Sequence, residues 1–323
     1  MKFLPVIYLW LALSLAACAL SPTPVSNPSG IVHAAIEATP TLPPASTPVL
    51  YPTFPPTWTW TPEPTVPSIT STLTLTPTPT PCAETQGNVY LISVSSETLN
   101  YPIDALLYLP PCYDTSDRAY PVLYLIHGLN FTEDQWERLG VAAAADELIT
   151  AGEIAPLIIV MPRDRLDDRL DEAFVTDLMP AIDRNYRTLT DREHRAIGGL
   201  SRGGAWAIHI GLHYTDAFGR IGAHSPAIFF GDEKNILQWI RHLPEAQIPA
   251  VYIDIGENDS LVHSAYWFDQ VLTYSKIEHT YILRPGSHSE KYWSAHVAEY
   301  LSFYAADWLK VATATPVIPD ILQ

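Results

Sequence analysis

The segment Gly199-Leu200-Ser201-Arg202-Gly203 has a serine with a glycine two positions before it and another two positions after it. It lies between an apolar run that begins at Ala196 and a helix-like segment that extends to about Leu212. In a tight strand-to-helix turn, side chains at both glycine positions would collide with the neighbouring strand or helix. The pattern therefore predicts an exposed, nucleophilic Ser201. The alternative is a glycine-rich turn in which Ser201 only caps the helix.

A serine hydroxyl is a weak nucleophile unless a base takes its proton, and a third group must hold that base. Asp259 follows an expected strand at 250–255, and His288 lies between an expected strand at 280–283 and the last expected helix. The order serine, acid, histidine predicts Asp259 as the acid and His288 as the base. Glu257 is the reserve acid, and Asp254 is a poorer one because it would lie within the strand. Taken singly, Asp259 could be a helix cap and His288 a loop histidine.

The negative charge that develops on an attacked carbonyl needs fixed hydrogen-bond donors. The expected donors are the backbone N–H groups of Arg202, directly after the serine, and of Leu129, in the loop that follows the strand at 122–126. His127 in the same loop is a candidate for contact with the substrate. A structural role, in which His127 packs against the loop and holds it in place, is the favoured interpretation.

Metal chemistry is not expected from the sequence. His209 and His213 are four residues apart on an expected helix, but the sequence suggests no third ligand for them. The acidic and basic residues at 163–171 alternate, which indicates a solvated, self-paired loop near the mouth of the cleft. No metal ion and no cofactor are therefore predicted.

These residues need a scaffold, and the alternation of apolar runs with helix-like segments indicates one. The expected strands are 89–94, 103–109, 122–126, 157–160, 196–199, 221–223, 250–255 and 280–283. The expected helices are 141–150, 172–186, 202–212, 236–242, 261–275 and 289–309. This alternation predicts an α/β fold with a mainly parallel sheet and helices on both faces.

The N-terminal region reads as an export signal followed by a spacer. Residues 1–20 have a basic start, an apolar middle and a small-residue end. Their segment Leu15-Ala16-Ala17-Cys18 resembles the bacterial lipobox, which implies a lipid on Cys18 and a domain anchored to the membrane on its extracytoplasmic face. An uncleaved membrane anchor is the alternative. Residues 21–81 are rich in Pro, Thr and Ser and are expected to be a disordered linker.

The rest of the chain is expected to be one domain at 82–311 with a tail at 312–323. Cys82 and Cys112 remain once Cys18 is assigned, and a pair in an exported protein predicts a disulfide. The net charge of −17 argues against a nucleic-acid partner, because binding phosphates requires a basic surface.

With these segments assembled, the domain resembles the esterase family of α/β-hydrolases that includes esterase D, enterochelin esterases, feruloyl esterases and mycolyltransferases. The resembling stretches are Leu109 to Asp114, Tyr120 to Gly128, Arg195 to Gly204, and Gly286 to Ser289 with Tyr292-Trp293. The resemblance implies an α/β-hydrolase fold, the triad Ser201, Asp259 and His288, and a position for Trp136 near the cleft. Two departures, Arg202 in place of methionine and Glu290 in place of tryptophan, imply a more polar cleft.

The sequence thus predicts an extracytoplasmic serine esterase that acts on a small-molecule or polysaccharide ester. Two alternatives stay open, an acyltransferase acting on envelope sugars or lipids and a non-catalytic surface binding protein with a hydrolase fold. Acetylated or feruloylated polysaccharide, a siderophore lactone and a lipid ester all fit as substrates. The oligomeric state is not indicated.

Overall fold

The computed structural model describes residues 82–309. The expected signal segment with Cys18, the linker at 21–81 and the tail at 312–323 lie outside the described residues. Among the residues described, no helix combines the length and the apolar character that crossing a membrane requires.

The core of the domain is one eight-stranded sheet. Its strands are, in chain order, β1 (Asn88–Val94), β2 (Ile103–Leu109), β3 (Val122–Ile126), β4 (Ile158–Pro162), β5 (Arg195–Leu200), β6 (Arg220–His224), β7 (Ala250–Gly256) and β8 (His279–Arg284). They lie in the order β1-β2-β4-β3-β5-β6-β7-β8. β2 pairs antiparallel with β1 and with β4, and all the other pairs are parallel. The predicted mainly parallel sheet is confirmed.

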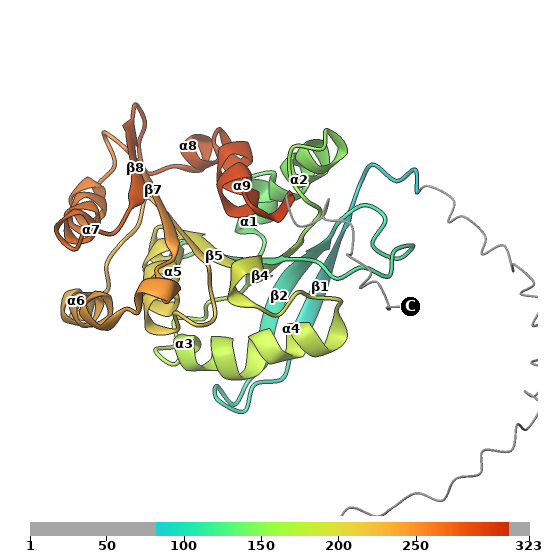
Figure 1. Cartoon of the computed structure of the whole chain (residues 1–323), viewed down its shortest axis with the longest axis horizontal. Coiled ribbons are helices and arrows are strands. Elements are labelled where there is room, and N and C mark those ends of the chain that lie inside the picture. Colours follow the sequence, from blue (N-terminus) through green and yellow to red (C-terminus); the bar gives the residue numbers. More distant parts are fainter. Residues whose placement is uncertain (1–81, 310–323) are drawn as a thin grey trace, which may run out of the picture. The chain divides into compact units, whose positions relative to one another are not determined.

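Helices cover both faces of this sheet, as predicted. One face carries α3 (Leu170–Ala173), α4 (Met179–Asn185), α5 (Arg202–His213), α6 (Asp232–His242) and α7 (Val262–Tyr274). The other carries α1 (Gln135–Arg138), α2 (Val141–Thr150), α8 (Glu290–Ser294) and α9 (Val297–Ala305). In Figure 1, α2, α8 and α9 lie on one side of the sheet, and α3 and α4 lie on the opposite side.

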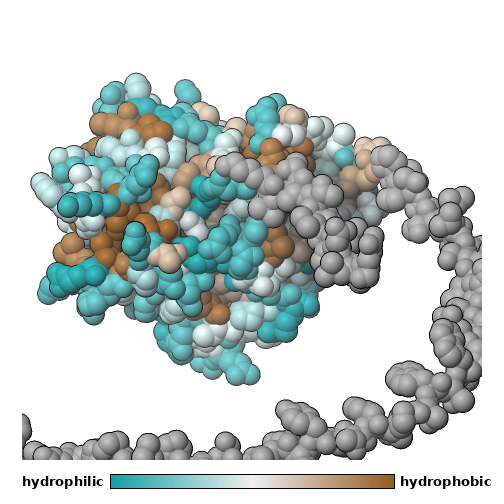
Figure 2. Space-filling model, viewed as in Figure 1, coloured by the Kyte–Doolittle hydropathy of each residue, from teal (hydrophilic) through white to brown (hydrophobic). Residues whose placement is uncertain are grey.

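The central strands are buried on both faces, which explains their continuous apolar sequences. Every residue of β3, β4 and β5 is buried, whereas residues of the edge strand β1 are exposed or half-buried. Two apolar layers result, one under each set of helices. Figure 2 shows a largely hydrophilic outer face on which apolar side chains appear in separate patches.

Two of the expected helices are interrupted. The helix expected at 172–186 begins earlier, at Leu170, and contains a π-helical turn (Phe174–Leu178) directly before α4. Pro180 has no N–H to donate to the carbonyl of residue 176, so the regular α pattern cannot run through this point. The helix expected at 289–309 is two helices, α8 and α9, with a break at His296. Apolar residues continue across that break, which is why their spacing does not reveal it.

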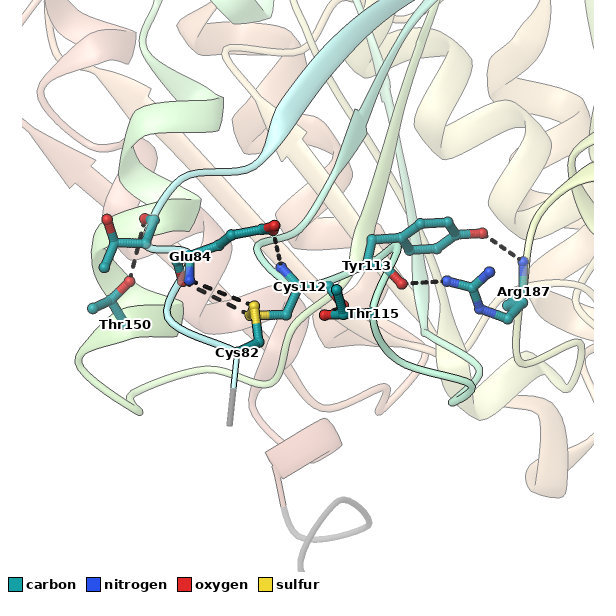
Figure 3. Close-up of a disulfide and its surroundings, with 8 residues drawn as sticks. Cys82, Glu84, Cys112, Tyr113, Thr115, Thr150 and Arg187 are labelled. Carbon is teal, nitrogen blue, oxygen red and sulfur yellow. Dashed lines mark hydrogen bonds between the residues drawn. A yellow bond between two sulfur atoms is a disulfide. The ribbon is translucent and has the colours of Figure 1, made fainter. Parts of the chain in front are cut away.

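The predicted disulfide is confirmed, and it ties the first described residues to the end of β2. Cys82 and Cys112 are bonded, with Cα atoms 5.8 Å apart. Glu84 accepts a hydrogen bond from the Cys112 N–H at 2.9 Å, as drawn in Figure 3. The bond therefore closes the segment that contains both antiparallel strands, β1 and β2.

We expect the double variant Cys82→Ala/Cys112→Ala to lose about 3–4 kcal/mol of unfolding free energy. The bond closes a loop with a sequence separation of 30, and opening it gives the unfolded chain more conformational entropy. Urea unfolding of the two proteins measures the difference. A reductant should destabilise the wild type and leave the double variant unchanged; equal midpoints for all samples would contradict the prediction.

Candidate active site

Ser201 lies at the tip of a tight turn between β5 and α5. Its backbone has φ 58° and ψ −116°, a positive-φ conformation that is uncommon outside glycine. A Cβ added at Gly199 would collide with the backbone of Gly203, and one at Gly203 would collide with the Ile126 carbonyl. Only glycine at both positions allows the helix to approach the sheet so closely. The turn places the half-buried serine at the carboxyl end of the sheet.

His288 and Asp259 converge on this serine from the loops that follow β8 and β7. His288 Nε2 lies 2.9 Å from Ser201 Oγ, and its Nδ1 lies 2.9 Å from each carboxylate oxygen of Asp259. With Nδ1–H donating to the carboxylate, Nε2 offers a lone pair to the serine hydroxyl. The structure thus brings together Ser201, His288 and Asp259, the three side chains that the sequence predicts to form the site.

Asp259 is placed so that it stays ionised. Its side chain is fully buried, which opposes ionisation, but hydrogen bonds from His288, the Leu261 N–H and Ser225 outweigh that cost and hold the pKa of Asp259 below its usual range. A buried carboxylate can hold the imidazole ring and stabilise its positive charge when it takes a proton. Trp293 packs its ring edgewise against His288, with centroids 4.9 Å apart, and so limits the rotation of the imidazole ring.

The other two acids considered from the sequence do not contact His288. Glu257 is exposed. Asp254 is fully buried within β7 and bonds to His224 Nδ1 at 2.7 Å and to the hydroxyls of Tyr292 and Tyr300. Asp254 therefore belongs to a buried polar network under the site.

The expected donors for a developing oxyanion flank Ser201. Leu129 and Ser201 line one pocket of about 300 Å³ together with His288, Ser289, Glu290 and Trp293. Within residues 82–309, the backbone N–H groups of Leu129 and Arg202 have no hydrogen-bond acceptor. Both groups are therefore free to bind a carbonyl oxygen of a substrate.

A buried glutamine that the sequence reasoning missed holds the loop that carries Leu129. Gln135, at the start of α1, is fully buried and its Oε1 accepts a hydrogen bond from the Gly128 N–H at 2.8 Å. Its Nε2 donates to Glu290 at 3.3 Å, and Arg138 also pairs with Glu290 at 2.8 Å. Gln135 thus connects Gly128 and Glu290, two residues that line the pocket. A glutamine at the start of a short helix gives no signal of this role in the sequence.

His127 braces this loop from the other side. Its Nδ1 donates to the Gly128 carbonyl at 2.8 Å, and its Nε2 accepts the Asp164 N–H at 2.9 Å. Burial lowers the pKa of His127, in keeping with a neutral ring that donates at one nitrogen and accepts at the other. Both ring nitrogens are occupied, so this position favours bracing over contact with a substrate.

The loop at 163–171 is not uniformly solvated and self-paired, contrary to expectation. Asp164 is buried and accepts hydrogen bonds from the Arg202 guanidinium at 2.6 Å and from the Trp206 indole at 2.9 Å. The Arg202 guanidinium also lies over the Phe229 ring, 5.0 Å from its centroid. The Arg202 side chain therefore points away from the pocket and connects the loop at 163–171 to α5.

Trp136 does not line the cleft, and its expected position there must be corrected. It is 1% exposed, and its indole N–H donates to the Ile126 carbonyl at 3.1 Å. Its ring packs edgewise on His224 and Tyr300 beneath the pocket. Trp136 therefore supports the end of β3 from below and is out of reach of a substrate.

Comparison with known proteins identifies the family. The model of the family described as "Putative esterase" matches residues 96–304, about two thirds of the chain. The chain belongs to this family. A solved ferulic acid esterase superposes with a TM-score of 0.63 at 26% identity, covering 68% of this chain and 98% of its own. The matched region is an esterase domain with the α/β-hydrolase fold.

Two curated relatives have the same degree of identity. An endo-1,4-beta-xylanase/feruloyl esterase of Xylanibacter ruminicola is 32% identical over 46% of this chain and 23% of its own length. An esterase of Mycobacterium tuberculosis is 32% identical over 50% of this chain and 36% of its own length. The esterase chain thus spans about a quarter to a third of the length of these relatives.

We expect Gln135→Met to lower kcat for p-nitrophenyl acetate by roughly 10- to 100-fold with a smaller change in KM. The substitution leaves the Gly128 N–H without its acceptor and frees the loop that holds the Leu129 N–H; loss of one oxyanion donor costs on the order of 10²–10³ in kcat. Steady-state kinetics measure the two constants separately. The same substitution at exposed Gln238 is the control, and a folded Gln135→Met enzyme with wild-type kcat would contradict a positioning role.

Proposed function

We propose that the esterase domain hydrolyses carboxylic esters through a covalent acyl-enzyme on Ser201. The observation that carries the proposal is the continuous hydrogen-bond chain from Ser201 Oγ through His288 to the carboxylate of Asp259. Nucleophilic catalysis by serine requires a base within hydrogen-bond distance of the hydroxyl and an acid that fixes the tautomer of that base. His288 and Asp259 meet these two requirements.

The first half of the reaction transfers the acyl group to the enzyme. Ser201 Oγ attacks the ester carbonyl carbon while its proton passes to His288 Nε2, and Asp259 stabilises the imidazolium. The N–H groups of Leu129 and Arg202 bind the oxyanion of the tetrahedral intermediate. The intermediate collapses, the bond from the carbonyl carbon to the alcohol oxygen breaks, and His288 returns the proton to the leaving alcohol.

Water completes the second half. His288 Nε2 takes a proton from a water molecule, whose oxygen attacks the acyl carbon of the acyl-enzyme. The bond to Ser201 Oγ then breaks, His288 protonates the serine, and the carboxylic acid leaves. His288, Ser289 and Glu290 line the pocket and are only half-buried, so a water molecule can reach His288 Nε2.

An ester of an aromatic acid carried on a polysaccharide is the substrate class that the comparisons support best. Both the solved ferulic acid esterase and the Xylanibacter relative bear names of that activity. In this chain the pocket beside Ser201 has apolar walls from Leu129, Phe131, Leu200 and Trp293, against which an aromatic acyl group can pack.

We expect Ser201→Ala to lower kcat for both p-nitrophenyl acetate and methyl ferulate by about 10⁶-fold, the loss that follows removal of a triad serine. The matched control is Ser294→Ala, since Ser294 is an exposed serine in α8. Initial rates with the purified full chain measure the effect.

Equal hydrolysis by the Ser201→Ala protein and the wild type would overturn the serine mechanism. A wild type that forms the acyl-enzyme but releases product only when an alcohol acceptor is added would favour acyl transfer. A folded wild type that is inert toward every ester would favour a binding role.

We further propose that the domain works outside the cytoplasm, tethered to a membrane by lipid on Cys18. The lipobox-like segment at 15–18 and the Pro/Thr-rich stretch at 21–81 support a lipidated N-terminus on an extended spacer. The bond between Cys82 and Cys112 supports the same location, because disulfides persist in oxidising compartments.

We expect Cys18→Ala to move the full-length protein from the membrane fraction to the soluble fraction of bacteria that express it, because the variant has no thiol to carry the lipid. Detergent should release the wild type and change nothing for the variant. Immunoblots of the two fractions measure the shift. Retention of the Cys18→Ala protein in membranes would overturn lipidation and favour an uncleaved apolar anchor.

A further inference from the structure

A second cluster of chemically active side chains lies on the opposite end of α5 from Ser201. His209 and His213 are one turn apart on α5, and Asp171 of α3 faces both. One atom from each of the three lies within 4.8 Å of the others. The sequence offered only the histidine pair, and the fold supplies the third group from 38 residues earlier in the chain.

The separations of Asp171 from the two histidines are compatible with a shared metal ion. Asp171 Oδ2 lies 3.4 Å from His209 Nε2 and 3.7 Å from His213 Nδ1. Both distances exceed the 2.7–3.2 Å of a good N–H···O bond. Ligands held about 2.0–2.1 Å from a tetrahedral zinc ion are about 3.3 Å apart, which is close to both values.

The surroundings hold the rings in this orientation. His209 Nδ1 bonds to Asp232 Oδ2 at 2.8 Å, and the other oxygen of Asp232 is bonded to Asn235. A carboxylate on the far nitrogen of a ligating histidine fixes the orientation of the ring. Burial lowers the pKa of His209, but the Asp171 and Asp232 carboxylates outweigh it and raise this pKa to about 9, so a metal ion binds at Nε2 by displacing a proton. Trp239 stacks on the His213 ring at 4.9 Å and packs edgewise on the His209 ring, also at 4.9 Å.

We propose that Asp171, His209 and His213 bind a divalent transition-metal ion of the zinc class. Two imidazole nitrogens and one carboxylate oxygen suit Zn²⁺ and disfavour Ca²⁺ and Mg²⁺, which require more oxygen ligands. Water completes the coordination, and the partly exposed His213 side chain leaves an entry path from solvent. Asp232 is a positioning residue that acts through His209.

The proposed metal site has a structural role, because it links helices on one face of the sheet. It joins α3 to α5, and Asp232 extends the connection to α6. α3 directly follows the loop at 163–169, which Asp164 fastens to Arg202 beside the nucleophile. A bound ion therefore stabilises the helices that support the pocket and takes no part in the ester chemistry.

The test is zinc binding by the purified full chain after treatment with EDTA and dialysis. Titration with ZnCl₂ against a chromophoric chelator should reveal one high-affinity ion per chain that the His213→Ala protein lacks. The same zinc addition should raise the Tm of the wild type and leave that of His213→Ala unchanged, because only a binding native state is stabilised. Asp232→Asn should retain the site with roughly 10- to 100-fold weaker binding.

The matched control is His242→Ala, which removes an exposed histidine that bonds only to the Gln238 carbonyl of its own helix. It should bind zinc as the wild type does. Because His213 is distant from Ser201 in α5, hydrolysis of p-nitrophenyl acetate by His213→Ala checks that this variant is folded. No zinc binding by the wild type, or equal binding by wild type and His213→Ala, would overturn the site and leave the three side chains as an ion-pair cluster.

Discussion

The close approach of α5 to β3 and β5 is the constraint on which the site depends. The first turn of α5 lies against the Ile126 carbonyl, and no side chain fits at Gly203 or at Gly199 opposite it. This contact goes with the positive-φ backbone of Ser201 and holds its hydroxyl at the carboxyl end of the sheet. Because the carboxyl ends of β7 and β8 lie along the same edge, the loops with Asp259 and His288 reach it without long excursions.

The loops around the serine are held by buried polar bonds. Gln135 anchors Gly128, His127 joins that loop to Asp164, and Asp164 in turn fixes Arg202. The first two of these bonds are buried and the third is partly buried, so the loss of any of them would leave a polar group without its partner. The pocket is therefore preorganised by side chains that do not touch its interior.

Two histidine–aspartate pairs lie close together in the fold, and their surroundings separate their roles. His224 and Asp254 are completely buried and bonded to tyrosine hydroxyls; burial and the adjacent Asp254 carboxylate raise the pKa of Tyr292 and Tyr300 well above the usual range, so both stay protonated donors. His288 has a similar carboxylate partner, but its side chain is 29% exposed and its second nitrogen faces a serine hydroxyl. Solvent access and the neighbouring serine hydroxyl, rather than the histidine–aspartate pair itself, distinguish His288 from His224.

The sequence by itself predicted the order of strands and helices along the chain, the two glycines of the turn at Ser201, the disulfide, and the serine, histidine and aspartate that the fold brings together. These follow from local spacing, because buried parallel strands are continuously apolar and the site residues come directly after strand ends. Only the tertiary structure decided which side chains face which. In the folded chain, Trp136 is buried beneath the pocket and Arg202 bonds to Asp164. Gln135 bonds to Gly128, and Asp171 lies beside two histidines that are distant in sequence. Such contacts join residues that are far apart in the chain, so neither hydrophobic periodicity nor motif spacing predicts them.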